Sequence, residues 1–143
     1  MTKVNVSVDL PCTPEKAWAT VSDLSRFEEW LTIHQKWSGE LPAEIRQGSK
    51  VTEVVSVMGM ANKIEWTVEE YDEPHSLKIS GTGMAGVKVS FTLTVQPKGA
   101  GSEADIDAEF TGQMIVGPIG AAVGKSTKGE LERSVAKLAE LVS

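Results

Sequence analysis

The side chains that most often take part in catalysis or metal binding are few in this chain and are scattered. There are two histidines and one cysteine. Neither His34 nor His75 has a cysteine, a histidine or a carboxylate at the spacing typical of a metal site. No serine stands in the G-x-S-x-G turn of a hydrolase nucleophile. We therefore predict no metal, no organic cofactor and no catalytic residue, and the sequence favours a non-enzymatic role without settling it.

Two segments match nucleotide-binding motifs in their letters but not in their context. Residues 81–86 read G-x-G-x-x-G, yet residues 87–95 alternate like a strand, whereas the dinucleotide fingerprint opens a helix. Residues 120–126 resemble a phosphate loop, but the two glycines are one residue too close and the segment has a helical pattern. We expect neither motif to bind a nucleotide.

Acidic side chains are numerous, but their pattern places most of them in water. They alternate with apolar residues along predicted strands, which is typical of a solvated face and not of paired catalytic carboxylates. The residues concerned are Glu65, Glu69, Glu70, Asp72, Asp105, Asp107 and Glu109. The net charge of −6 leaves no basic excess for a nucleic acid or for an anionic membrane surface.

The chain offers no signal for export or for membrane insertion. Residues 1–10 alternate between apolar and polar instead of forming the apolar core of a signal peptide. No later stretch approaches the ~20 apolar residues of a transmembrane helix. A single cysteine, Cys12, excludes an intrachain disulfide. We expect a cytoplasmic protein.

Hydrophobic periodicity divides the chain into strands and helices. Helical spacing in residues 14–22 and 24–31 predicts two short helices, with Thr13 and Asp23 as N-caps. Alternation with a period of two predicts strands near residues 4–10, 63–69, 77–80, 87–95 and 103–110. Residues 51–58 form a further strand of ambiguous phase, where a bulge would fit, because Val54 and Val55 are adjacent. The connections are too short for helical crossovers, which indicates antiparallel pairing.

The last segment is predicted to be a long helix that covers this sheet. Its apolar stripe consists of Ile119, Ala122, Val123, Leu131, Val135, Leu138 and Val142. We predict one α+β domain, residues 1–143, with a curved antiparallel sheet of about seven strands wrapped around the helix. Strand phase directs Trp66 and Phe91 inward and Tyr71 outward. Gly120 and Gly124 either leave room for a ligand or allow close packing on the sheet.

This order of elements resembles the START-like superfamily, also described as Bet v 1-like, SRPBCC or polyketide cyclase/dehydrase and lipid-transport domains, whose fold is the helix grip. Residues 29–34 (EWLTIH), 59–64 (GMANKI), 86–89 (GVKV) and 117–120 (GPIG) resemble an actinobacterial branch of it. The resemblance implies a hydrophobic cavity for lipids, steroids or polyketides. One mycobacterial member of that branch is described as the toxin of a toxin–antitoxin pair.

Turn positions in a meander predict an open end to such a cavity. Met58, Met60, Met84 and Met114 would gather there with Ile33, His34, Ile115 and Val116. Methionine suits adaptable apolar surfaces, so this rim is either a ligand entrance or a plug of the core. The predicted ligand-binding residues are Trp30, His34, Met58, Met60, Ile64, Trp66, Met84, Phe91, Phe110, Met114, Ile115, Ile119 and Val123.

Three functions follow from these expectations. The first is binding or transport of an apolar small molecule such as a lipid, fatty acid or polyketide. The second, which rests on the resemblance alone, is a toxin that pairs with an antitoxin protein. The third is a polyketide cyclase or aromatase, for which Asn62 and His34 are the candidate polar groups inside the cavity.

Overall fold

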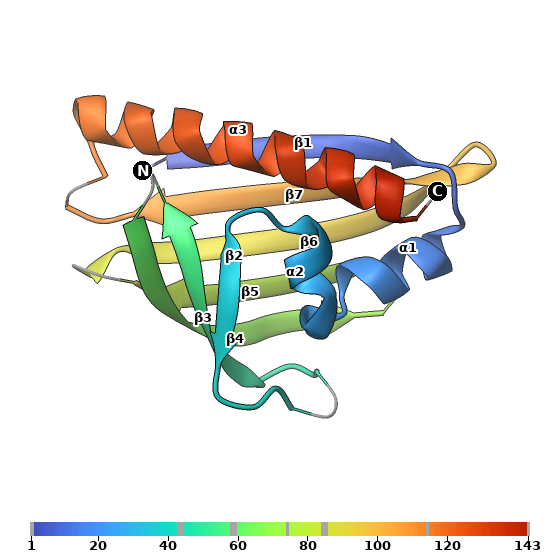
Figure 1. Ribbon diagram of the computed structural model, residues 1–143, viewed down its shortest axis with the longest axis horizontal. Coiled ribbons are helices and arrows are strands. Elements are labelled where there is room, and N and C mark those ends of the chain that lie inside the picture. The colour runs from blue at the N-terminus through green and yellow to red at the C-terminus, as the bar shows by residue number, and fades with distance from the viewer. Residues whose placement is uncertain are drawn as a thin grey trace.

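A long helix lies across the inner side of a curved antiparallel sheet (Figure 1). The computed structural model describes residues 2–42, 45–57, 60–73, 75–83, 86–113 and 115–142, with the backbone alone for Val57 and Met60. The elements in chain order are β1 (Thr2–Leu10), α1 (Pro14–Val21), the 3-10 helix η1 (Leu24–Arg26), α2 (Phe27–Trp30), β2 (His34–Ser38), β3 (Lys50–Val57), β4 (Met60–Asp72), β5 (Ser76–Thr82), β6 (Lys88–Lys98), β7 (Gly101–Thr111) and α3 (Gly117–Leu141).

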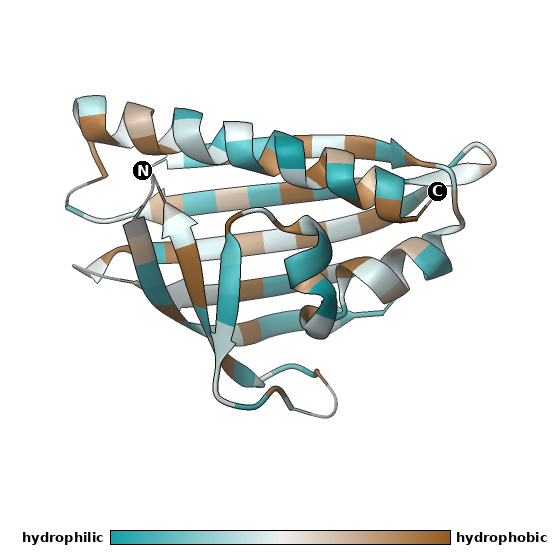
Figure 2. Ribbon diagram, in the orientation of Figure 1, coloured by the Kyte–Doolittle hydropathy of each residue, from teal (hydrophilic) through white to brown (hydrophobic). Residues whose placement is uncertain are grey.

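The sheet has seven strands in the order β1-β7-β6-β5-β4-β3-β2, and every neighbouring pair is antiparallel. Apolar and polar residues alternate along the strands, so that one face is buried and the other is wet (Figure 2). The buried face meets α3 and the short helices. This arrangement confirms the predicted α+β class and the antiparallel sheet around a C-terminal helix.

The ambiguous strand, β3, is regular in its pairing with β4. Val51, Glu53 and Val55 are buried, whereas Thr52 and Val54 are half-buried. The register irregularity lies in the neighbouring strand β2, between His34 and Lys36. The inward face of β3 therefore carries a carboxylate.

Tyr71 corrects the predicted strand phase. A register shift between Val68 and Glu70 in β4 adds one residue relative to β5, which reverses the phase of the residues that follow. Tyr71 then pairs with the buried Leu77 and packs against the core, edge to face with Trp18 at 5.8 Å between ring centroids. The prediction that it points outward is wrong.

The short helices begin where the caps were predicted. The Thr13 hydroxyl accepts a hydrogen bond from the Lys16 amide at 3.3 Å, and an Asp23 carboxylate oxygen accepts one from the Ser25 amide at 3.1 Å. The second predicted helix divides into η1 and α2. Both caps satisfy amide groups that a helix N-terminus leaves without an internal partner.

The start of α3 packs closely on β1. A Cβ added at Gly120 would lie 3.1 Å from Thr2 Oγ1, and one at Gly124 would lie 2.9 Å from Thr2 Cγ2. The Thr2 hydroxyl also donates to the Gly120 carbonyl oxygen at 3.1 Å. Close packing therefore accounts for these two glycines. Because Gly120 forms the inner face of the first turn, Ile119 is 52% exposed and Ala122 is exposed as well. The prediction that these two residues belong to the buried stripe is wrong.

Among the described residues, no helix combines the length and the apolar composition that crossing a bilayer requires.

Candidate functional site

The described residues enclose a small cavity between the sheet and α3. Its volume is about 20 Å³, enough for about one water molecule. The lining side chains are mainly apolar and come from four strands, from α3 and from the segment before β2. They are Ile33, Val55, Ser56, Ile64, Val89, Phe91, Phe110, Ser126, Thr127 and Glu130. The described side chains thus leave little open space at this point under α3.

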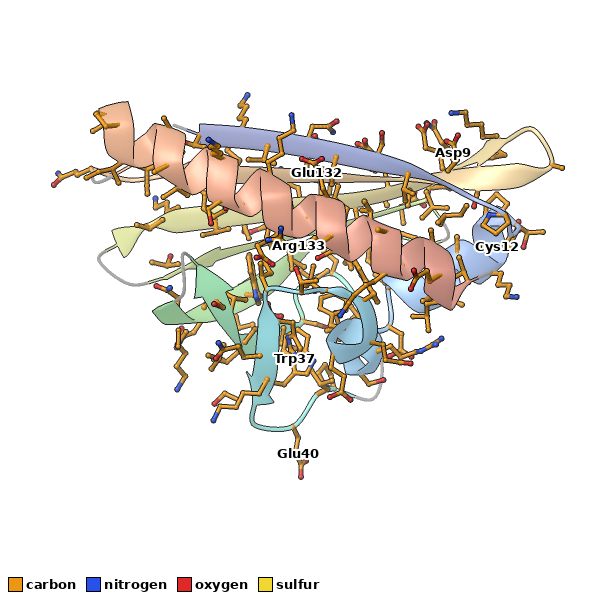
Figure 3. The ribbon with its side chains drawn as sticks, turned by 45° about the horizontal axis from the view of Figure 1, so that its top comes forward. Asp9, Cys12, Trp37, Glu40, Glu132 and Arg133 are labelled. Atoms are coloured by element: carbon orange, nitrogen blue, oxygen red, sulfur yellow. The ribbon has the colours of Figure 1, made fainter. Side chains whose placement is uncertain are left out.

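The segment between α2 and β2 is hydrogen-bonded to α3 beside this cavity. The Thr32 hydroxyl donates to Glu130 Oε2 at 2.6 Å, and the Thr32 amide donates to Ser134 Oγ at 2.9 Å. Arg133, on the side of α3 above β2 in Figure 3, forms an ion pair with the Glu130 carboxylate. The Thr32 hydrogen bond and then the Arg133 guanidinium lower the pKa of Glu130. We call the contact of Thr32 with Glu130 and Ser134 the latch.

A buried polar network lies between β2, β3 and β4. The Glu53 carboxylate, on a residue that is 1% exposed, accepts a hydrogen bond from Trp66 Nε1 at 2.9 Å and is bonded to His34 Nδ1. A carboxylate buried to this degree is costly unless polar partners surround it. Both of its oxygens have such a partner. Within the described part of the chain, no three side chains of the metal-ligand types gather as a metal site would require.

Aromatic rings surround the histidine of this network. The His34 ring centroid is 6.1 Å from that of Phe27 and 5.0 Å from that of Trp37. Trp37 belongs to β2, and its side chain lies between β2 and α2 in Figure 3, where Nε1 donates to the Leu24 carbonyl oxygen at 2.8 Å. These contacts fix the short helices against β2 and leave His34 little freedom to turn.

Two indole groups in the core lack a hydrogen-bond partner among the described residues. They are the Nε1 groups of Trp18, which is 2% exposed, and Trp30, which is 1% exposed. A buried donor without an acceptor costs about 1–3 kcal/mol. Neither tryptophan lines the cavity.

The predicted site residues occupy different places. Ile64, Phe91 and Phe110 line the cavity. Trp66 stacks on Phe91 with ring centroids 5.4 Å apart, and it therefore forms the layer behind the lining. The remaining predicted residues that are buried without lining the cavity are Trp30, His34, Ile115 and Val123. Ile119 is exposed.

The predicted methionine rim lies outside the described residues. Met58, Met84 and Met114 are not part of the description, and the side chain of Met60 is not either. Of the other rim residues, Ile33 and Ile115 are buried and Val116 is 58% exposed. The methionine entrance therefore stays a prediction.

Sequence reasoning missed Glu53. The signal was present, because Glu53 stands two residues from Val51 and two from Val55, in the phase of the buried residues. A carboxylate at an inward position of a strand points to a buried partner. The adjacent pair Val54 and Val55 hid that phase.

Comparison with known proteins gives a family and close relatives. A family model described as polyketide cyclase / dehydrase and lipid transport matches residues 1–143. An uncharacterized protein of Mycobacterium tuberculosis is 39% identical over 141 residues, which cover 99% of each chain. A second protein of that organism, named as a toxin, is 39% identical over 135 residues, which cover 94% of each chain.

Solved structures share the fold. The crystal structure of a Thermus thermophilus protein matches with a TM-score of 0.76 and 20% sequence identity, over 98% of this chain and 96% of that one. At this identity the likeness concerns the fold alone.

Proposed function

Because the chain belongs to the polyketide cyclase/dehydrase and lipid-transport family, we propose that it binds an apolar small molecule between the sheet and α3. The observation that carries the proposal is the apolar lining of the cavity under α3, in which Ile64, Phe91 and Phe110 come from three different strands. Binding sites for small molecules are mostly apolar concavities with a few polar groups. The polar groups here are three hydroxyls and the Glu130 carboxylate.

Ligand entry requires the cavity to widen, since about 20 Å³ holds no lipid chain. The latch is the contact that would have to open. Thr32 and Glu130 are half-buried, and each of their hydrogen bonds contributes about 1–2 kcal/mol. Opening the latch thus costs much less than unfolding the domain, whose stability would be about 5–15 kcal/mol. Residue Ile33, next to Thr32, would move away from the cavity in the same step.

A direct test is native mass spectrometry after exposure of the protein to a total cell lipid extract. We expect a retained mass, and binding of cis-parinaric acid, a fluorescent fatty acid, that the retained molecule displaces. Val89→Phe adds volume to the lining and should abolish both. Val95→Phe is the matched control, because Val95 is also buried on β6 but does not line the cavity.

Overpacking costs each variant about 1–3 kcal/mol, so near-ultraviolet circular dichroism must first show that both remain folded. If the wild-type protein retains no lipid and no parinaric acid, the proposal is refuted. Equal loss in the two folded variants would show that the binding is not at the cavity.

A second candidate function is that of a toxin in a toxin–antitoxin pair. It is supported by the 39% identity to a mycobacterial protein named as a toxin. The test is induced expression in the organism of origin, with growth arrest that co-expression of a neighbouring gene product relieves. Unimpaired growth on induction without that product would count against this function.

A cyclase mechanism has weaker support. It needs an acid or base that faces the substrate, and among the described residues that line the cavity the titratable one is Glu130. Its lowered pKa makes it a poor proton donor. His34, a sequence candidate for this role, is bound to Glu53 and does not line the cavity.

A further inference from the structure

The start of α3 differs from the rest of the chain in charge and in exposure. Residues 110–129 contain no aspartate or glutamate, although these make up 20 of the 143 residues. Val116 and Ile119 are 58% and 52% exposed, and they are the exposed large hydrophobic residues among those described. Figure 1 places this end of α3 at one end of the molecule, and Figure 2 shows the apolar colour of the segment leading into it. Exposed apolar residues close together often mark an interaction site.

Three lysines share a groove with Val116, whereas Ile119 lies outside it. Lys3 of β1 and Lys125 and Lys128 of α3 line one groove, and none of the described residues that line it is acidic. None of the three takes part in the ion pairs found among the described residues. Acidic side chains lie on the neighbouring strand β7: Glu109 pairs in register with Lys3, and Asn5, which lines the groove, donates to Asp107 Oδ1 at 2.6 Å.

The helix itself adds to the positive potential at this end. The first turn of α3 has no acidic residue, and its N-cap residue Val116 makes no side-chain hydrogen bond to the helix. The free amide groups of a helix N-terminus carry a partial positive charge. The described residues that line the groove therefore carry charge of the opposite sign to the net charge of −6.

We propose that this end of the molecule docks on an anionic lipid surface. Val116 and Ile119 would enter the interfacial region, while Lys3, Lys125 and Lys128 would contact headgroup phosphates. Exposed apolar residues near lysines bind such surfaces both by burying apolar area and by electrostatic attraction to the anionic headgroups. The overall charge opposes the approach, so the docking is weak, oriented and dependent on ionic strength.

An acidic polypeptide segment is the other occupant with matching charge. Ile119 does not line the groove. A segment lying in the groove would thus leave Ile119 in water, whereas a lipid surface covers both apolar side chains. The geometry favours the lipid surface.

The experiment is co-sedimentation with vesicles of phosphatidylcholine alone and of phosphatidylcholine with an equal part of phosphatidylglycerol. We expect the protein to bind only the second, and less as salt is added. Lys125→Glu with Lys128→Glu should reduce the partition coefficient at least about tenfold, because each lysine near an anionic leaflet raises it several-fold. Val116→Ser with Ile119→Ser should reduce it by a similar factor. All four residues are exposed, so the fold should tolerate these changes.

The matched control is Lys16→Glu with Lys137→Glu, which makes the same change in net charge at exposed positions away from this end. Its binding should fall much less. Equal loss in the control, or no binding of the wild-type protein, would overturn the proposal. Binding of poly-L-glutamate that requires Lys125 and Lys128, without vesicle binding, would assign the groove to an acidic protein segment instead.

Docking does not depend on the proposed function. Vesicle binding by a protein that retains no lipid would refute ligand binding and leave docking intact. Retention of a lipid by a protein that does not bind vesicles would refute docking and leave ligand binding intact.

Discussion

The buried network of His34, Glu53 and Trp66 allows a quantitative test of how a carboxylate is held in this core. In His34→Leu, Glu53 loses one partner and stays buried, which should destabilise the protein by about 3–5 kcal/mol. In Glu53→Leu, Trp66 Nε1 and His34 Nδ1 both lose their acceptor, at about 1–3 kcal/mol each. In the double variant only Trp66 Nε1 is left without a partner, which costs about 1–3 kcal/mol.

The double variant should therefore be more stable than His34→Leu, even though it carries an additional substitution. Urea denaturation of the four proteins at neutral pH, followed by tryptophan fluorescence, measures the free energies of unfolding for a double-mutant cycle. We expect a coupling of about 4–8 kcal/mol between the two positions, because the cost at Trp66 cancels in the cycle whereas the costs of the unpaired Glu53 carboxylate and of the unpaired His34 Nδ1 do not. Additive effects of the two substitutions, or a cost below about 1 kcal/mol for Glu53→Leu, would refute the reasoning.

Three further changes test other parts of the structure by the same measurement. Gly129→Ala should stabilise the protein by about 1 kcal/mol, because an added Cβ meets only an arginine nitrogen at 3.9 Å. Gly120→Ala should give no such gain, because the added Cβ would lie 3.1 Å from Thr2 Oγ1. Equal gains in the two variants would contradict the packing described for α3. Thr32→Val should cost about 1–2 kcal/mol at neutral pH. The Thr32 hydrogen bond lowers the pKa of Glu130 from the usual 4.5, so the cost of Thr32→Val should shrink as the pH falls below 4.5 and Glu130 becomes protonated. A cost that does not change with pH would show that it does not arise from the bond to the Glu130 carboxylate. Desolvation is the main cause that raises the pKa of Asp105. Asp105→Asn should therefore stabilise the protein slightly at neutral pH, and this gain should vanish at pH values below 3.8, the usual pKa of an aspartate. Destabilisation by Asp105→Asn at neutral pH would argue against desolvation as the cause.

Much of the fold could be predicted because one face of the sheet is apolar along most of its length. Alternation in β6 and β7 assigns Phe91 and Phe110 to the inner face, and the structure buries both. The short connections between strands required antiparallel pairing, which the register confirms. The resemblance to the START-like superfamily, which the order of elements indicates, is confirmed by the family match over residues 1–143.

The errors arose where geometry depends on contacts between segments that are distant in the sequence. Whether a strand contains a bulge depends on its partner, so the reversed phase at Tyr71 could not be read from β4 alone. The contact of Gly120 with Thr2 determines which side of the first turn of α3 faces the sheet, and these two residues are 118 positions apart in the sequence. Helical spacing indicated the stripe but not which side of the first turn packs, and Ile119 was placed inside for that reason.

The candidate site was predictable in its apolar part only. Phe91, Ile64 and Phe110 follow from strand phase. The latch joins Thr32 to Glu130, and no local pattern relates two residues so far apart. Predicting it would require the position of α3 over the segment before β2.

The pairing of the first strand with the last one constrains the order in which the protein can fold. Thr2 of β1 lies opposite Phe110 of β7, so a strand that is synthesised early must wait for a partner that is synthesised much later. Pairings between such distant residues slow folding, because the loop must close before the contacts can form. Until β7 has been synthesised, the backbone N–H and C=O groups of the β1 segment have no partner strand, and such unpaired segments associate readily with other chains. The nascent chain of this protein should therefore depend on chaperones until β7 and α3 have been synthesised.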